Sequence, residues 1–122
     1  MAFPTILSNV ETQHLANLRQ GGGVVVLVTG VFDLLHEEHQ KFLLRARAAG
    51  DVLIVGIESD QRVRQLKGED RPIWPQEHRK NQLELLQSVS MVVILPDDFH
   101  NPEQRTQLLL EVRPDVLAVS SH

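Results

Sequence analysis

The stretch VVVLVTGVFDLLH, residues 24–36, decides the expected fold. Val24–Val28 is an unbroken run of valine and leucine, which is typical of a strand covered on both faces. Gly30 follows this run, and a residue without a Cβ lets the backbone turn sharply and approach a ligand closely. Residues 37–49 then show a helical pattern with one apolar face, made by Phe42, Leu43, Ala46 and Ala49. A buried strand, a glycine turn and a helix in this order predict the first unit of a parallel sheet.

The same alternation continues along the chain. The apolar runs predict further strands at residues 52–57, 91–95 and 116–119, and the helical patterns predict helices at residues 9–20, 60–66, 75–87 and 102–112. Together they predict an α/β fold, a Rossmann-like parallel sheet with helices on both faces and the strand at 24–28 in its centre. Ligands bind such sheets at the carboxyl ends of the strands, beside the switch in strand order. The search for a site therefore starts at Thr29 and Gly30.

Length and composition limit the other possibilities. The chain has 122 residues, which predicts one domain over residues 1–122 with a leading helix in residues 1–22. It contains no cysteine, which excludes a disulfide scaffold and a thiolate metal site. The net charge of −4 argues against a nucleic-acid binder, and no apolar run approaches the ~20 residues that span a bilayer. Residues 1–10 lack the pattern of a signal peptide, so the sequence predicts a cytoplasmic protein.

Two histidines stand at the start of the helix that follows the glycine turn. His36 and His39 are three residues apart, so on a helix they project from the same face. A helix start attracts phosphate, and two imidazoles there can donate hydrogen bonds to phosphoryl oxygens. Asp33 can hold the turn by accepting bonds from nearby backbone N–H groups. The alternatives are a surface pair without chemistry and a zinc site, but the zinc-protease helix spaces its histidines four apart, so no metal site is predicted.

Residues 30–39, GVFDLLHEEH, resemble the GxFDxxHxGH signature of the cytidylyltransferase-like nucleotidyltransferases. Residues 66–73, LKGEDRPI, closely resemble the LKG-x-x-RP-x loop in the nucleotidyltransferase domain of ADP-heptose synthase. The chain is also similar to glycerol-3-phosphate cytidylyltransferase. Further parts resemble the family's second strand, its E-x-R helix start and its last strand entry, at residues 50–56, 77–79 and 113–117. The resemblance spans nearly the whole chain.

The resemblance implies a reaction and a set of residues. A sugar or polyol phosphate attacks the α-phosphate of ATP or CTP, and pyrophosphate leaves. His36, His39 and Lys67 would be the catalytic residues, since they match the positions that stabilise charge on the phosphates. The nucleotide would be held by Thr29, Gly30, Val31, Phe32, Asp33 and Arg79. The resemblance also implies Mg²⁺ with the triphosphate and a homodimer. Charge and hydropathy, not the resemblance, predict neither nucleic acid nor membrane as a partner.

The sequence departs from the family pattern at three places. Glu38 stands where the family has a glycine that leaves room for the nucleotide, and it adds bulk and negative charge there. Thr29 stands where the heptose branch often has asparagine. The chain stops at Val119–His122, where the family continues to a serine/threonine-rich motif that binds the triphosphate. These departures leave open an alternative function, a degenerate nucleotide-binding homologue that is catalytically weak or inactive.

Overall fold

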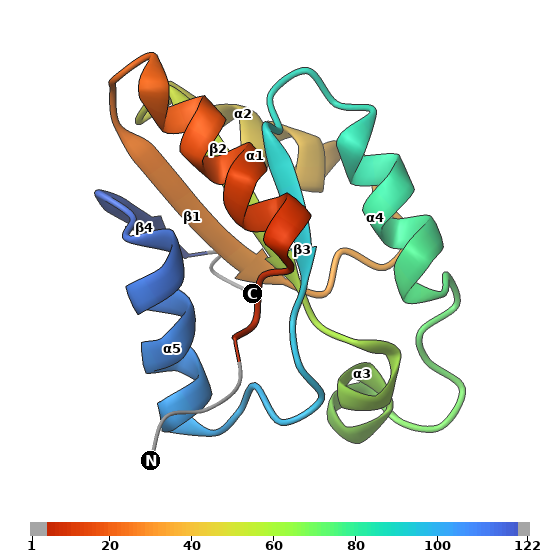
Figure 1. The fold of residues 1–122 in the computed structure, drawn as a ribbon. Helices are drawn as coiled ribbons and strands as arrows, with labels where there is room; N and C mark the ends of the chain where they lie inside the picture. Colours follow the sequence, from red (N-terminus) through yellow and green to blue (C-terminus); the bar gives the residue numbers. More distant parts are fainter. Residues whose placement is uncertain (1–4, 120–122) are drawn as a thin grey trace.

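The computed structural model describes residues 5–119, and its centre is a parallel sheet in the order β3-β2-β1-β4 (Figure 1). The strands are β1 (Val25–Gly30), β2 (Val52–Ile57), β3 (Met91–Ile94) and β4 (Val116–Ala118). β1 pairs with β2 along its whole length, from Val25 opposite Val52 to Gly30 opposite Ile57, and with β4 on its other side. The predicted α/β Rossmann-like fold is therefore confirmed, and so is the inner position of the first strand.

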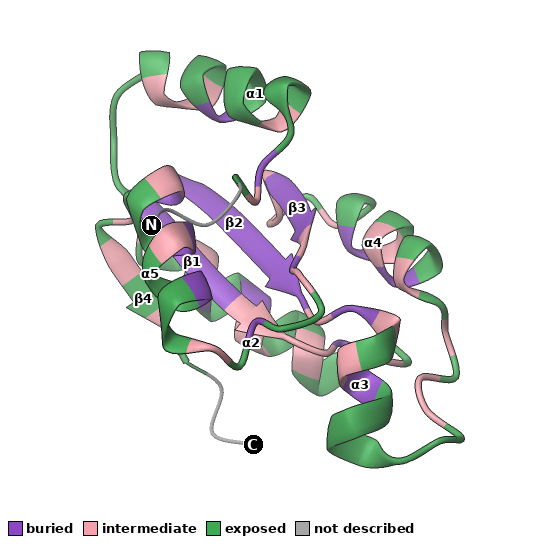
Figure 2. Cartoon of the chain, turned by 60° about the horizontal axis from the view of Figure 1, so that its bottom comes forward, coloured by how far each residue is buried: buried purple, intermediate pink, exposed green. Residues whose placement is uncertain are grey.

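Helices cover both faces of the sheet. They are α1 (Asn9–Gln20), α2 (Glu37–Ala48), α3 (Asp60–Lys67), α4 (Gln76–Glu84) and α5 (Pro102–Val112). α1 and α5 bury apolar side chains in a cluster on one face, and α2 and α4 do so in a second cluster on the other face. Figure 2 shows the buried strands between these layers and α3 as a largely exposed helix. Within residues 5–119, no helix is long and apolar enough to cross a lipid bilayer.

Several predicted boundaries were wrong by a few residues. Val24 lies outside β1 and is exposed; its N–H donates to the Asp51 carboxylate, and its C=O accepts from the N–H groups of Asp51 and Val52. β1 instead continues through Thr29 and Gly30, which pair with the end of β2. α4 ends at Glu84 and not near residue 87, because the next N–H groups bond three residues back and tighten the last turn. β3, β4 and α2 each end one residue earlier than predicted, and α3 ends one residue later.

The turn after β1 is shaped by a buried aromatic ring. Phe32 and Leu34 have left-handed backbone conformations, with φ of 52° and 50°. A Cβ on Gly30 would lie 2.8 Å from Cε2 of Phe32, so the ring needs a glycine beneath it. The ring is 6% exposed and packs with the α2–α4 cluster. Burial of this ring thus offsets a left-handed conformation that costs about 1–2 kcal/mol per residue, and it fixes the loop that leads into α2.

Candidate functional site

Two clefts open at the carboxyl ends of the central strands. β1 lies between β2 and β4, so the strand order switches direction beside it, as expected for a ligand site in this type of sheet. The first cleft, here called the α2 cleft, has a volume of about 330 Å³ and is lined by the turn after β1, α2 and the end of α3. The second, the α5 cleft, has a volume of about 300 Å³ and lies between β1, β4 and α5. Thr29 and Glu58 line both clefts, so the two meet at the ends of β1 and β2.

The α2 cleft brings together residues that are far apart in the sequence. Those among the predicted site residues that line it are Thr29, Gly30, Val31, Phe32, His39 and Lys67. The N-terminus of α2 lies at the same place, because α2 begins at Glu37 directly after the turn. Positive helix-end charge, backbone N–H groups, an imidazole and an ammonium therefore surround one cleft. This combination of groups suits a polyphosphate.

The two histidines are stacked on each other. The ring centroids of His36 and His39 are 3.8 Å apart with an angle of 17° between the planes, and the edge of His39 also meets Phe32. The backbone N–H of His36 donates to Nδ1 of His39 over 3.3 Å. Because Nδ1 accepts this bond, the neutral ring of His39 carries its proton on Nε2, which is then the donor nitrogen. His36 is exposed and is not among the described residues that line the cleft.

Lys67 reaches the cleft from the last turn of α3. The sequence placed it at the start of a loop, whereas it is the last residue of α3, and Gly68, whose φ is 108°, caps the helix. Lys67 is exposed, so its ammonium can move toward a ligand in the cleft. The sequence predicts that His36 and His39 face one pocket together with Lys67; His39 and Lys67, 28 positions apart in the sequence, both line the α2 cleft, whereas His36 is not among its described lining residues.

Arg79 differs from the expectation that it holds the triphosphate directly. Its side chain is 0% exposed. Its guanidinium donates to the backbone oxygens of Trp74, Val31 and Glu58 and to Oδ1 of Asp60, over 2.8–2.9 Å. Arg79 thus ties together the turn after β1, the loop after β2 and the start of α4. This arrangement positions the backbone of the α2 cleft and leaves the guanidinium away from its surface.

The sequence predicts that Asp33 bonds to nearby backbone N–H groups, but it bonds instead to the loop between α3 and α4. Its carboxylate accepts from the backbone N–H groups of Ile73 and Trp74, over 2.8 and 2.9 Å, and pairs with Arg71 at 3.3 Å. Burial alone would raise the pKa of Asp33, but the Trp74, Ile73 and Arg71 bonds outweigh it and hold the pKa below its ordinary value. Asp33 therefore anchors the loop between α3 and α4 to the turn, and it is not among the described residues lining either cleft.

Glu38 is a solvent-exposed residue in the first turn of α2. Its side chain is 66% exposed and lies 3.6 Å from the ammonium of Lys41, which also pairs with Glu37. It is not among the described residues that line the α2 cleft. The structure therefore gives no support to a strong charge repulsion between Glu38 and a polyanion bound in the α2 cleft.

Glu58 is the residue of the site that the sequence analysis missed. It follows β2 directly, lines both clefts, and its side chain is only 14% exposed. Burial raises the pKa of Glu58, against the lowering effect of Arg62, Arg105, Arg79 and His100. A signal was available, because a carboxylate directly after an apolar strand lies at the edge where this fold binds ligands.

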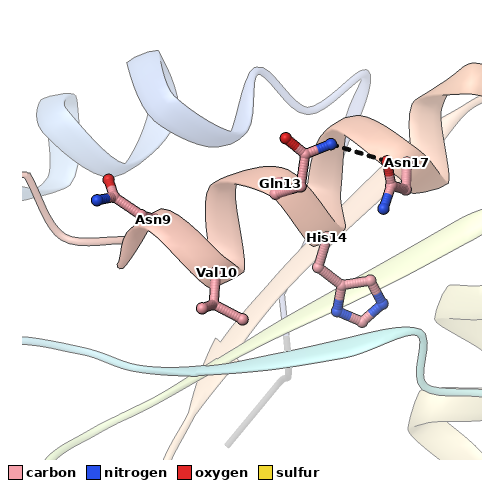
Figure 3. A pocket seen from close by; sticks show the side chains of 5 residues that line it. All are labelled: Asn9, Val10, Gln13, His14 and Asn17. Atoms are coloured by element: carbon pink, nitrogen blue, oxygen red, sulfur yellow. Dashed lines mark hydrogen bonds between the residues drawn. The ribbon is translucent and has the colours of Figure 1, made fainter.

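A wider depression of about 450 Å³ on the outer face of α1 is a poor candidate for the same chemistry (Figure 3). The described residues that line it are Asn9, Val10, Gln13, His14 and Asn17, all from one helix. Two of them are bonded to each other, since Gln13 donates to Asn17 over 2.9 Å. None of these five is a lysine, arginine or carboxylate, so the depression offers no charged group to hold or balance a triphosphate.

Comparison with known proteins agrees with this geometry. Residues 27–122 match the family described as "Cytidylyltransferase-like". The chain therefore belongs to the cytidylyltransferase-like family, as the motif in residues 30–39 predicted.

Individual relatives narrow the resemblance. The chain is 44% identical over 101 residues to "Bifunctional protein HldE" of a Nitratiruptor species, covering 83% of this chain and 21% of that protein. It is 40% identical over 115 residues to the HldE of Campylobacter concisus, covering 94% of this chain and 23% of the relative. The chain thus spans about a fifth of the length of these curated relatives. Among solved structures, the lipopolysaccharide core biosynthesis protein from Thermoplasma volcanium GSS1 is similar, with a TM-score of 0.67 and 28% identity over 79% of this chain and 73% of that chain.

Proposed function

We propose that this chain is a nucleotidyltransferase that moves a nucleotidyl group from ATP or CTP to a sugar or polyol phosphate and releases pyrophosphate. The observation that carries the proposal is the meeting of His39 and Lys67 in one cleft at the N-terminus of α2. Membership of the cytidylyltransferase-like family supports the reaction class. The similar structure of a lipopolysaccharide core biosynthesis protein supports an acceptor of the sugar type, since a polysaccharide is built from sugars.

In the proposed reaction, a phosphate oxygen of the acceptor attacks the α-phosphorus of the triphosphate. The new P–O bond forms as the bond from the α-phosphorus to the bridging oxygen breaks, and pyrophosphate leaves with that electron pair. Positioning and charge stabilisation carry such a reaction, so the protein has little covalent work. Nε2–H of His39 would donate to a phosphoryl oxygen, and the ammonium of Lys67 would balance the charge of the two phosphates that meet. His36, whose ring is stacked on that of His39, would add to the stabilisation of charge on the phosphates.

Magnesium is proposed as the companion of the triphosphate. Among the described residues, no group of three or more His, Cys, Asp and Glu side chains could hold a metal ion. An ion with the triphosphate would then take most of its ligands from phosphate oxygens and water, which is usual for Mg²⁺ in nucleotide sites.

The proposal is tested by measuring pyrophosphate release from ATP and CTP with a panel of hexose, heptose and glycerol phosphates. We expect release with one nucleotide and a narrow group of acceptors. His39→Gln and Lys67→Met should each lower kcat/KM by about 100-fold or more, as loss of a charge-stabilising donor does. His14→Gln on α1 and Lys80→Met on α4 are matched controls outside the two clefts. Full activity in His39→Gln and Lys67→Met would contradict the assignment of these residues.

The alternative function is nucleotide binding without turnover. The departure at Glu38 suggested it, but the exposed position of Glu38 and its pairing with Lys41 give it little support. The departure at the chain end falls on Ser120–His122, which lie outside the described residues. Calorimetric binding of ATP or CTP without pyrophosphate release from any acceptor in the panel would favour this alternative over the enzyme.

A homodimer and a cytoplasmic location stay predictions. For the homodimer, light scattering at micromolar concentration is the direct measurement, and a particle of twice the 13.8 kDa chain mass is expected. A particle of the monomer mass at all concentrations would contradict it.

A further inference from the structure

The carboxylate of Glu58 lies at the junction of the two clefts. Glu58 is the first residue after β2, and its backbone N–H donates to the carbonyl of Gly30 over 3.0 Å. This bond extends the pairing of β1 and β2 by one step and fixes the backbone of Glu58. Its side chain lines both clefts together with Thr29 of β1. A group in this position can contact a ligand that lies across the ends of the two strands.

The carboxylate lacks the hydrogen bonds that buried charges normally have. Its side chain is 14% exposed, and Oε1 is buried without a hydrogen-bond partner in the described part of the chain. Oε2 lies 3.9 Å from Nε of Arg62, too far for a hydrogen bond, and that Nε is also without a partner among the described residues. Buried polar atoms in native proteins are almost always bonded, so an orphaned carboxylate oxygen at a ligand cleft requires an explanation.

Nearby side chains do not supply the missing donor. The guanidinium of Arg79 donates to the backbone oxygen of Glu58 and to three other oxygens, so it is committed elsewhere. Arg105 faces the carboxylate from α5 and lies in the α5 cleft, but it makes no hydrogen bond to it in the structure. The other walls of the α5 cleft are mainly apolar, formed by Leu27, Phe99 and Leu108 among others. No described side chain, Lys67 of the same cleft and His100 included, donates to Oε1 in the structure, so a molecule that enters the clefts can supply the donor.

We propose that Glu58 is a specificity-determining residue whose Oε1 accepts a hydrogen bond from a hydroxyl of a sugar in the bound substrate. A phosphate cannot be the partner, because two negative groups at contact distance repel. A sugar hydroxyl is a neutral donor, and both substrates of the proposed reaction can carry one, on the ribose of the triphosphate or on the acceptor sugar. In other Rossmann-type sites an acidic residue downstream of the glycine turn binds a ribose hydroxyl, which shows that the geometry is feasible. The inference rests on the proposed function.

The first experiment separates the two sources of the hydroxyl. Calorimetry measures the affinity of wild type and Glu58→Ala for ATP and CTP and for their 2′-deoxy and 3′-deoxy analogues. If the ribose is the donor, wild type should bind the ribonucleotide about 10- to 100-fold more tightly than one deoxy analogue, and Glu58→Ala should bind both alike. If the acceptor sugar is the donor, Glu58→Ala should bind nucleotides normally and raise the KM for the sugar phosphate by the same factor.

Two further variants control for indirect effects. Glu58→Gln keeps the shape and an acceptor oxygen, so it should retain part of the discrimination that Glu58→Ala loses. Glu84→Ala removes an exposed carboxylate from the end of α4 and should change neither quantity. Circular dichroism and thermal unfolding of all three variants check that each one is folded.

A second readout follows the proton on Glu58. Burial raises the pKa of the free carboxyl, and a hydrogen bond from a ligand hydroxyl to the charged form should lower it. Binding at mildly acidic pH should therefore release protons, which calorimetry in two buffers of different ionisation enthalpy detects. The release should be missing in Glu58→Ala and Glu58→Gln.

The outcomes distinguish this inference from the proposed function. If wild type binds nucleotides and releases pyrophosphate but Glu58→Ala matches it within twofold for every ligand, the inference on Glu58 is overturned and the enzyme stands. If wild type binds neither nucleotides nor sugar phosphates, the proposed function fails and takes this inference with it.

Discussion

Arg79 is a buried charge and Glu58 a largely buried one at the same edge of the sheet, and they differ in how far their hydrogen bonds are made within the protein. Arg79 is 0% exposed and donates hydrogen bonds to four oxygens, three in loops and one at the start of α3. Glu58 is 14% exposed in its side chain and has an oxygen with no partner in the described chain. A buried charge with all its bonds made within the protein supports the fold, and one left without them is suited to a ligand. Both residues lie near the site, so their position does not tell a structural role from a ligand-binding one. The hydrogen bonds that each side chain makes within the protein do tell them apart.

The largest expected effect comes from removing the satisfied charge. Arg79→Met should lower the free energy of unfolding by about 3–5 kcal/mol, because it leaves Asp60 and the oxygens of Val31, Glu58 and Trp74 without their buried donor. Urea unfolding followed by circular dichroism measures this loss. Arg45→Met, on the exposed face of α2, is the control and should change stability by less than about 0.5 kcal/mol. A loss no larger than that of Arg45→Met would show that the network contributes little.

Asp33 provides a second satisfied charge with a distinct pH signature. Asp33→Asn should lower the free energy of unfolding at neutral pH by about 1.5–3 kcal/mol, the range for hydrogen bonds to a charged group. The folded pKa of Asp33 lies below its ordinary value, so its contribution is present above pH ~4 and is lost as pH falls through the folded pKa. Urea unfolding between pH 2 and 7 should show a steeper acid loss in wild type than in the variant. Asp97→Asn, an exposed aspartate, is the matched control, and an equally steep loss in Asp33→Asn would contradict the assignment.

The fold could be predicted because its main signals are local. Continuous apolar runs and glycine or proline at element ends gave each strand and helix to within a few residues. The parallel sheet and the inner place of its first strand followed from general rules and are confirmed, whereas the full strand order was not predicted. The errors arose where tertiary contacts lie at the end of an element, as at Val24, which bonds to Asp51 and lies outside β1.

The site was harder to predict because roles depend on contacts between distant segments. His39, Lys67 and the turn after β1 line one cleft, as the motif predicts, but His36 is not among the described residues that line it. The motif could not show that Arg79 is buried or that Asp33 bonds to residues 71–74, since both facts come from the way the loops fold back. For Glu58 the sequence offered only its place directly after an apolar strand, and the missing hydrogen bond in a shared cleft wall comes from the structure.

Substitution of Glu58, the charge without a hydrogen-bond partner, should raise the stability of the protein, whereas substitution of Arg79 or Asp33 should lower it. Glu58→Gln removes a buried negative charge while keeping the shape, so the free energy of unfolding at pH 7 should rise by about 1 kcal/mol or less. Because the folded pKa is raised, the folded state binds more protons than the unfolded state between pH ~4.3 and the folded pKa, and wild-type stability falls as pH rises through that window. Thermal unfolding of both proteins from pH 4 to 8 should therefore show that the difference in stability between Glu58→Gln and wild type grows as pH rises. A variant that is less stable at pH 7 would mean that the attraction of Arg62 and Arg105 outweighs burial.

The smallest expected effect concerns Glu38, which the motif alone made the most suspect residue. Its side chain is 66% exposed and paired with Lys41, so Glu38→Gly should leave the affinity for ATP and CTP unchanged within about twofold. The same substitution should lower the stability of the protein by about 1 kcal/mol or less, since glycine is a poor helix former. Glu37→Gly is the matched control in the same helical turn, with 81% of its side chain exposed and the same Lys41 partner. Titrations of ATP and CTP at 50 and 300 mM salt should give the same affinity ratio for both variants, because screening acts alike on two solvent-facing charges. A clear gain in affinity for Glu38→Gly over Glu37→Gly, shrinking as salt rises, would instead place the Glu38 charge against the bound phosphates and return it to the list of residues that set activity.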